Sequence, residues 1–211
     1  MDFEAAFAAC PLVAILRGLR PDEALDHGKA LTDAGFTLLE VPLNSPEPLD
    51  SIATLSANLP QALVGAGTVL TAEDVRLVAE AGGRLIVAPN FSPAVAAEAR
   101  RLNLIYLPGI GTMSEAFAAL DAGASALKLF PAEMIPPVAV KAMRSVLPKD
   151  ARLLPVGGIN AQTMAAYLQA GANGFGLGGS LYSAGQDFKD TADKAAILIE
   201  AYKNFRSAGA G

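Results

Sequence analysis

The feature that most constrains this fold is a regular alternation of short apolar runs with amphipathic, helix-like segments. Eight apolar runs recur along the 211 residues, at a spacing of about two dozen residues. Apolar runs that are each followed by a helix are typical of parallel strands whose outer face is covered by helices. The runs are residues 13–18, 37–44, 63–69, 85–90, 105–109, 126–131, 153–160 and 174–180.

Eight strand–helix units predict an α/β fold, namely a closed (β/α)8 TIM barrel with a short N-terminal helix. The main alternative is an open, doubly wound sheet, which normally carries a G-x-G-x-x-G turn after its first strand. The stretch Arg17–Pro21 stands at that position and lacks the pattern. No composition shift or linker marks a boundary, so we expect residues 1–211 to form a single barrel domain.

The composition limits the partners and compartments that we expect. The chain is 52% hydrophobic with a net charge of −5, and no Lys/Arg cluster forms a basic face, which argues against a nucleic-acid partner. Every apolar run is too short to span a bilayer, and Met1–Ala9 lacks the basic start of an export signal. The single cysteine, Cys10, fits a reducing compartment. We expect a cytoplasmic protein without membrane contact.

The chain offers few ligands for a metal centre. Its only histidine, His27, lies in a helical pattern, and we expect it on the surface of that helix. With one histidine and one cysteine, a His/Cys metal site cannot be built from a single chain. The sequence therefore predicts no metal.

One cation lies inside the apolar run Ala126–Pro131. Because strand side chains alternate between faces, Lys128 shares a face with Ala126 and Phe130, while the two leucines beside it face the other way. If those leucines pack under a helix, Lys128 points into the interior, where an ammonium is unstable unless it is paired or loses its proton. Taken alone, the stretch also fits a lysine that extends to water on its four-carbon stem.

Two further charged residues lie near the ends of the first two strands. The alternation places Arg17 on one face with Val13 and Ile15, and it turns Glu40 to the same interior. Functional groups of a barrel collect at the carboxyl ends of its strands, so Arg17, Glu40 and Lys128 are expected near one mouth. An internal salt-bridge network is the alternative, but burying three charges is a poor way to stabilise a fold. We interpret the cluster as a candidate catalytic site.

Glycine-rich ends of the last two strands predict an anion site. Gly157 and Gly158 precede a helix, and Gly179 and Ser180 end the last strand. Their backbone N–H groups and the serine hydroxyl can converge on an anion, and the corresponding loops of a barrel commonly bind phosphate. A phosphorylated small molecule is the expected ligand.

Together these residues suggest amine chemistry on a ketone. A desolvated Lys128 near Arg17 loses its proton more readily, and the neutral amine can attack a ketone to form an imine. Glu40 can move protons if it reaches the reacting atoms. The protonated imine is itself an electron sink, so this chemistry needs no metal.

Five stretches of the chain form motifs that occur in a fixed order. They are Leu39–Pro46, Gly65–Val69, Leu107–Gly109, Leu127–Ala132 and Pro155–Ile159. In this order, and over nearly the whole chain, they resemble the class I 2-keto-3-deoxy-6-phospho-aldonate aldolases. The resemblance implies a homotrimeric lyase without a cofactor, which splits a phosphorylated keto acid into pyruvate and D-glyceraldehyde 3-phosphate through a lysine Schiff base.

The resemblance also implies a role for each candidate residue. Lys128 would form the imine with the C2 ketone, and Glu40 would act as general acid and base. Thr68 and the backbone of Gly65–Gly67 would hold the carboxylate end of the substrate, with Gly67 and Thr68 as the named binding residues. The other implied contacts are Arg17, Pro89, Phe130 and Val156 for the substrate, and Gly157, Gly158, Gly179 and Ser180 for the phosphate.

The C4 configuration of the substrate is predicted from two departures. The gluconate branch of the family tends to carry an arginine shortly after the glutamate and a threonine before the glycine pair, whereas this chain has Asn44-Ser45 and Val156. Both resemble the galactonate branch and predict 2-dehydro-3-deoxy-6-phosphogalactonate as substrate. Gly178–Ser180 is closer to the gluconate branch, so activity on both epimers stays open, since one hydrogen bond changes a rate only about tenfold.

Two other functions are compatible with the same residues. A phosphosugar isomerase or epimerase would use the phosphate glycines and Glu40, with Lys128 serving only as a charge. A non-catalytic barrel would bind a phosphorylated ligand without turnover. The clustering of a nucleophile, a base and an anion site favours the aldolase.

Overall fold

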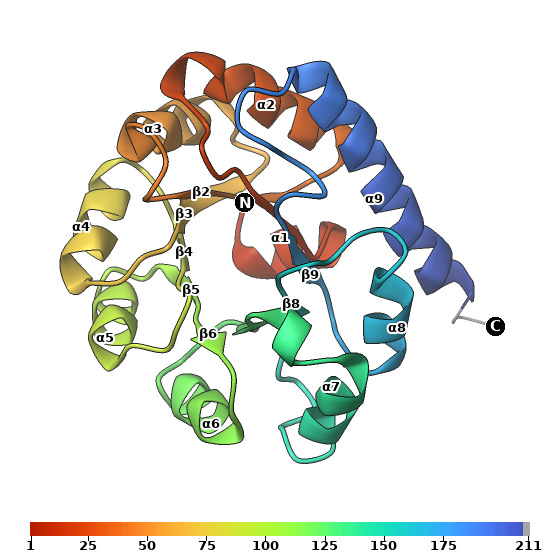
Figure 1. Cartoon of the computed structure of the whole chain (residues 1–211). Coiled ribbons are helices and arrows are strands. Elements are labelled where there is room, and N and C mark those ends of the chain that lie inside the picture. The colour runs from red at the N-terminus through yellow and green to blue at the C-terminus, as the bar shows by residue number, and fades with distance from the viewer. Residues whose placement is uncertain (209–211) are drawn as a thin grey trace.

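The computed structural model describes residues 1–208, with side chains described to residue 205. Parallel strands alternate with helices, and Figure 1 shows α2 to α9 in a ring around the strands. The helices are α1 (Phe3–Ala9), α2 (Pro21–Ala34), α3 (Pro48–Asn58), α4 (Ala72–Glu80), α5 (Pro93–Arg101), α6 (Met113–Asp121), the 3₁₀ turn η1 (Ala132–Met134), α7 (Pro137–Arg144), α8 (Met164–Gln169) and α9 (Phe188–Ala208). The strands are β1 (Leu12–Ile15), β2 (Leu38–Pro42), β3 (Leu63–Gly67), β4 (Leu85–Val87), β5 (Ile105–Leu107), β6 (Gly109–Ile110), β7 (Leu127–Leu129), β8 (Leu153–Pro155) and β9 (Phe175–Leu177).

The strands pair in parallel, in two hydrogen-bonded ladders. One ladder has the order β5-β4-β3-β2-β1-β9, and the other has the order β6-β7-β8. A parallel bridge between Val156 and Gly176 links the end of β8 to β9. Pro108 separates β5 from β6, and its carbonyl oxygen accepts a hydrogen bond of 2.9 Å from the N–H of Lys128. The expected α/β fold with a parallel, curled sheet is thus confirmed.

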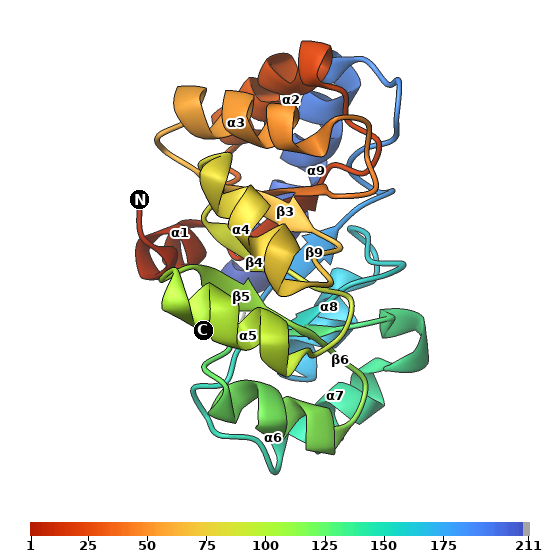
Figure 2. The same cartoon turned by 90° about the vertical axis from the view of Figure 1, so that its left-hand side faces the viewer.

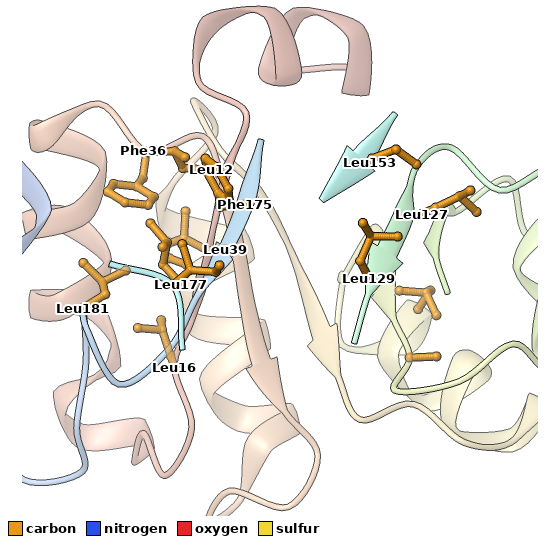
Figure 3. Packing of buried hydrophobic residues seen from close by; sticks show 14 of the residues in the cluster. Leu12, Leu16, Phe36, Leu39, Leu127, Leu129, Leu153, Phe175, Leu177 and Leu181 are labelled. Carbon is orange, nitrogen blue, oxygen red and sulfur yellow. The ribbon is translucent and has the colours of Figure 1, made fainter. Parts of the chain in front are cut away.

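The alternation of strand residues sorts the apolar side chains into two clusters. Side chains on one face of the strands, such as Leu39 and Leu127, pack under the surrounding helices (Figure 3). Side chains on the opposite, concave face, such as Leu38 and Ala126, form a second cluster. Because both neighbours of Lys128 belong to the cluster under the helices, Lys128 faces inward as predicted.

Helix α1 covers the amino ends of the strands. Phe3 and Ala6 of α1 belong to the inner cluster. The Thr37 hydroxyl, just before β2, donates to the Ala6 carbonyl at 2.8 Å. Arg152, just before β8, donates to the Glu4 carboxylate at 2.9 Å. Figure 2 shows α1 on one side of the sheet, so the carboxyl ends of the strands lie at the opposite end, where a site can form.

The expected surface position of His27 is wrong. His27 lies on α2, but it is only 2% exposed, and its Nδ1 lies 2.8 Å from the Thr191 hydroxyl of α9. The helical pattern around His27 gives no information about which distant element covers it. Here α9 packs along α2, 164 residues further on, and buries that face.

Within residues 1–208, no helix is both long enough and apolar enough to cross a bilayer. Helix α9 is the last element, ending at Ala208. The expected domain extends to residue 211, and its last three positions lie outside the described residues.

Replacing Gly65 in β3 by alanine is expected to destabilise the fold. A Cβ at Gly65 would lie 1.8 Å from the backbone oxygen of Leu85, so β3 and β4 would have to separate. We expect a loss of about 3 kcal/mol or more in the free energy of unfolding, measured by denaturant titration. Gly111→Ala is the matched control, because the nearest atom to its added Cβ lies 3.8 Å away. Equal stability of the two variants would contradict the tight β3–β4 contact.

Candidate active site

Strand β7 carries Lys128 into the interior of the fold. Its side chain is 8% exposed, and its backbone pairs with Gly109 on one side and Leu154 on the other. The Nζ atom lies 4.8 Å from the centroid of the Phe130 ring, two residues further along the same face. A cation at this distance is attracted by the negative face of the ring.

Burial lowers the pKa of the Lys128 ammonium below its ordinary value of 10.5. The negative charge of Glu40 works in the opposite direction, and the positive charge of Arg17 adds to the lowering. Loss of water outweighs the attraction to Glu40, so the neutral amine is populated at lower pH than in an exposed lysine. A neutral amine is the nucleophilic form.

Strand β2 places Glu40 on the same inner face. The side chain is 1% exposed, and burial raises the pKa of its carboxyl from 4.5 to about 7, against the lowering influence of Lys128 and Arg17. Its Oε2 atom has no hydrogen-bond partner among the described residues. A carboxyl with a pKa near neutrality and a free oxygen can both accept and return a proton.

The glycine at the end of β3 makes room for this carboxyl. A Cβ at Gly67 would lie 1.7 Å from Oε2 of Glu40, so any larger residue would displace the acid. Thr68 follows in the left-handed region, with φ of 57°, which is unusual for a threonine. Gly67 therefore belongs to the surroundings of Glu40.

Two adjoining cavities connect the buried pair to solvent. A narrow inner cavity is lined by both Lys128 and Glu40, and an open outer cavity of about 870 Å³ lies beside it. Both cavities are lined by Ile15, Val156 and Gly176, so they meet at the ends of β1, β8 and β9. The outer cavity contains the predicted Arg17, Phe130, Gly157, Gly158, Gly179 and Ser180.

The outer cavity has the features of an anion site. Gly157 and Gly158 adopt positive φ angles of 113° and 62°, a backbone shape that glycine adopts without strain. The Ser180 hydroxyl is buried and has no hydrogen-bond partner among the described residues. Arg17, an exposed cation, lines the same cavity. Turned backbone N–H groups, a hydroxyl and a guanidinium are suited to a phosphate.

Three predicted residues lie outside the lining of these cavities. Gly67 ends β3, and Thr68 and Pro89 follow β3 and β4, but none of the three is among the residues that surround either cavity in the described chain. Pro89 instead packs its carbonyl against β6, where a Cβ on Gly109 would lie 2.1 Å from it.

Glu133 and Tyr182 are among the residues of the outer cavity that were not predicted from the sequence. Glu133 lies in η1, and its carboxylate covers the glycine pair: a Cβ at Gly157 would lie 2.3 Å from its Oε2. It follows β7 closely, so the rule that functional groups gather after strands would have found it. Tyr182 follows β9 and could have been found in the same way.

The described residues offer no metal centre. Between residues 1 and 208, no three His, Cys, Asp or Glu side chains come together in a way that could hold a metal ion.

Known proteins resemble this chain in sequence and in fold. The profile of the aldolase family described as KDPG and KHG aldolase matches residues 3–197. The chain is 47% identical over 194 residues to the 2-dehydro-3-deoxy-6-phosphogalactonate aldolase of Escherichia coli K12, covering 92% of this chain and 95% of that protein. It is 31% identical over 167 residues to the KHG/KDPG aldolase of the same strain, covering 78% of each.

A solved structure described as native KDPGal superposes with a TM-score of 0.92 at 45% identity, covering 93% of this chain and 96% of the other. Similarity of this extent includes the strands that carry the buried amine and carboxyl. The chain belongs to the KDPG and KHG aldolase family.

Proposed function

We propose that this protein is a class I aldolase that cleaves 2-dehydro-3-deoxy-6-phosphogalactonate into pyruvate and D-glyceraldehyde 3-phosphate. The observation that carries the proposal is the inward-facing pair of Lys128 and Glu40, whose pKa values are shifted toward neutrality from opposite sides. The pair adjoins a cavity suited to a phosphate. The name of the relative that is 47% identical supports the choice of substrate.

In the proposed reaction, the neutral amine of Lys128 adds to the C2 ketone, and loss of water gives a protonated imine. Glu40 takes the proton of the C4 hydroxyl while the C3–C4 bond breaks, and the bonding electrons move into the imine. This step releases D-glyceraldehyde 3-phosphate and leaves the enamine of pyruvate. Glu40 then protonates C3, and hydrolysis of the imine frees pyruvate and regenerates the amine.

We assign the phosphate to the outer cavity. Its ligands would be the backbone of Gly157 and Gly158, the backbone of Gly179 and the Ser180 hydroxyl, which has no hydrogen-bond partner in the described part of the chain. Arg17 would supply positive charge between this end and the amine, because it influences both Lys128 and Glu40.

We assign the keto-acid end to the inner face. Gly67 and Thr68 would hold the carboxylate beside Glu40, and Pro89 would close the pocket at the next strand. Phe130, which already contacts the amine, would pack on the imine. Val156 would lie against C4, because it lines both cavities.

We also infer that the two ladders close into one eight-stranded (β/α)8 barrel, with β5 and β6 as the two halves of its fifth strand. The Val156–Gly176 bridge joins β8 to β9, and only Pro108 lies between β5 and β6. A proline has no N–H for a ladder, which explains the interruption. Residues 1–211 would then form one domain.

We propose a homotrimer in the cytoplasm. Large apolar side chains lie exposed on one part of the ring of helices, with Met134 78% and Val138 75% exposed near α7 and Phe117 43% exposed on α6. Such side chains are commonly covered by a partner. The single cysteine, Cys10, fits a reducing compartment.

Borohydride trapping tests the Schiff base directly. Reduction in the presence of pyruvate should leave a covalent adduct on Lys128, located by peptide mass spectrometry. Lys128→Arg keeps the charge but cannot form an imine, so it should give neither adduct nor turnover. Glu40→Gln should lower kcat by roughly 10²–10⁴-fold. An adduct at another lysine, or turnover by Lys128→Arg as an isomerase would show, would overturn the proposal.

The C4 epimers test the substrate choice. We expect kcat/KM to favour the phosphogalactonate substrate over the phosphogluconate epimer, measured by pyruvate release. Val156→Thr adds a hydroxyl beside C4 and should shift the ratio toward the gluconate epimer by up to about tenfold, the effect of one hydrogen bond. A wild-type preference for the gluconate epimer would contradict the assignment.

The raised pKa of Glu40 predicts a pH dependence of stability. The folded state holds this proton more tightly than the unfolded state, so the stabilisation is complete below pH 4.5 and is lost as the pH rises through about 7. Over this window the wild type should lose about 3 kcal/mol of unfolding free energy relative to Glu40→Gln, measured by denaturant titration. Parallel pH profiles of the two proteins would contradict a Glu40 pKa that is raised on folding.

A further inference from the structure

The loop between β9 and α9 carries half of the candidate phosphate site. Gly179, Ser180, Tyr182 and Ser183 all line the outer cavity. The loop turns sharply, because the N–H groups of Leu181 and Tyr182 both donate to the Gly178 carbonyl, at 2.8 and 2.9 Å. The direction of its N–H groups therefore depends on what holds this turn in place.

Gln186 ties the loop together through its side-chain amide. Its Nε2 donates to the Leu181 carbonyl at 2.9 Å and to the Thr191 hydroxyl of α9 at 2.6 Å. Its Oε1 accepts from the Ser183 N–H at 3.2 Å and from the Lys194 ammonium at 2.7 Å. One side chain thus connects the turn after β9 to the first turns of α9.

Thr191 passes this connection on to α2. The side chain is fully buried, and its hydroxyl lies 2.8 Å from Nδ1 of the buried His27. The hydroxyl accepts from Gln186, and its own proton can be donated to Nδ1 when the imidazole proton is on Nε2. Burial lowers the pKa of His27 and so favours the neutral imidazole.

Tyr182 makes a second connection to α2. Its ring and the His27 ring form a T-shaped pair with centroids 5.0 Å apart, and its hydroxyl donates to Oε1 of Glu23 at 3.1 Å. The loop also touches the turn that carries Arg17, since a Cβ at Gly18 would lie 2.8 Å from Cβ of Ala184. Figure 1 shows α9 lying beside α2, as these contacts require.

We propose that Gln186, Thr191 and His27, named here the α2–α9 clamp, are positioning residues for the phosphate end of the substrate. The clamp fixes the turn that presents Gly179 and Ser180, and it does not touch Lys128 or Glu40. Its loss weakens binding of the phosphorylated substrate and leaves the pyruvate chemistry intact. This inference rests on the proposed aldolase function.

Two readouts separate the clamp from a merely structural role. The first is KM for cleavage of the phosphorylated keto acid, together with the inhibition constant of inorganic phosphate. The second is exchange of the pyruvate methyl protons with deuterium, followed by NMR. Exchange needs only an imine on Lys128 and proton transfer by Glu40, so it reports the chemistry without the phosphate site.

Thr191→Val removes the hydroxyl at nearly constant volume. We expect KM and the phosphate inhibition constant to rise roughly five- to tenfold, the effect of losing one or two hydrogen bonds, with deuterium exchange within about twofold of the wild type. Thr191→Ser restores the hydroxyl and should restore both constants. Ser51→Ala is the matched control, because its buried hydroxyl on α3 has no hydrogen-bond partner among the described residues, and it should change neither readout.

The outcomes are distinct. If Thr191→Val leaves KM unchanged, or lowers exchange as much as it raises KM, the clamp is not a positioning device. If Thr191→Val fails to fold, Gln186→Met at its half-buried position decides by the same two readouts. A wild-type protein without any pyruvate exchange would instead refute the proposed aldolase function.

Discussion

The structure depends on burying an amine and a carboxyl together on the inner face of one parallel sheet. Lys128 and Glu40 are 8% and 1% exposed. Loss of water opposes the charged form of each group, while their mutual attraction favours both charges. Desolvation prevails, so the amine tends toward its neutral form and the carboxyl tends to keep its proton. Both groups are thereby brought toward the states that imine formation and proton transfer require.

The surrounding fold is arranged around this pair. The leucines beside Lys128 pack under the helices, which turns the lysine inward. Gly67 leaves space for the Glu40 carboxyl, whereas Gly65, two residues earlier, is needed for close contact with β4. The same short motif thus serves the site with one glycine and the sheet with the other. Helix α1 covers the amino ends of the strands, and the outer cavity adjoins the pair toward the loops at their carboxyl ends.

The alternation of side chains between the two faces of a strand was sufficient to predict that Lys128 and Glu40 point inward, because the direction of a side chain is a local property of its strand. The glycine loops were predictable for a similar reason, since backbone shape and position after a strand are local features. The break at Pro108 could have been expected from its missing N–H. The position of Glu133 shortly after β7 could have marked it as a candidate, but its contact with Gly157 is visible only in the folded chain.

His27 shows the limit of such reasoning. Its burial comes from a helix that begins more than 150 residues later, and the hydrogen bond that satisfies it spans a separation of 164 residues. No local pattern encodes this contact. The polar groups that link α2, α9 and the loop after β9 became visible only when their distances were known.

The account is tested most directly by the pKa of the Lys128 amine. Lysine labelled with ¹³C at Cε allows its titration to be followed by NMR in the wild type and in Glu40→Gln. Because burial removes water from the amine, we expect the pKa of Lys128 to lie below 10.5 in the wild type. Removal of the negative charge of Glu40 should lower the pKa of Lys128 further in Glu40→Gln. A wild-type pKa of 10.5, or a value that does not fall in Glu40→Gln, would contradict the buried, electrostatically coupled pair.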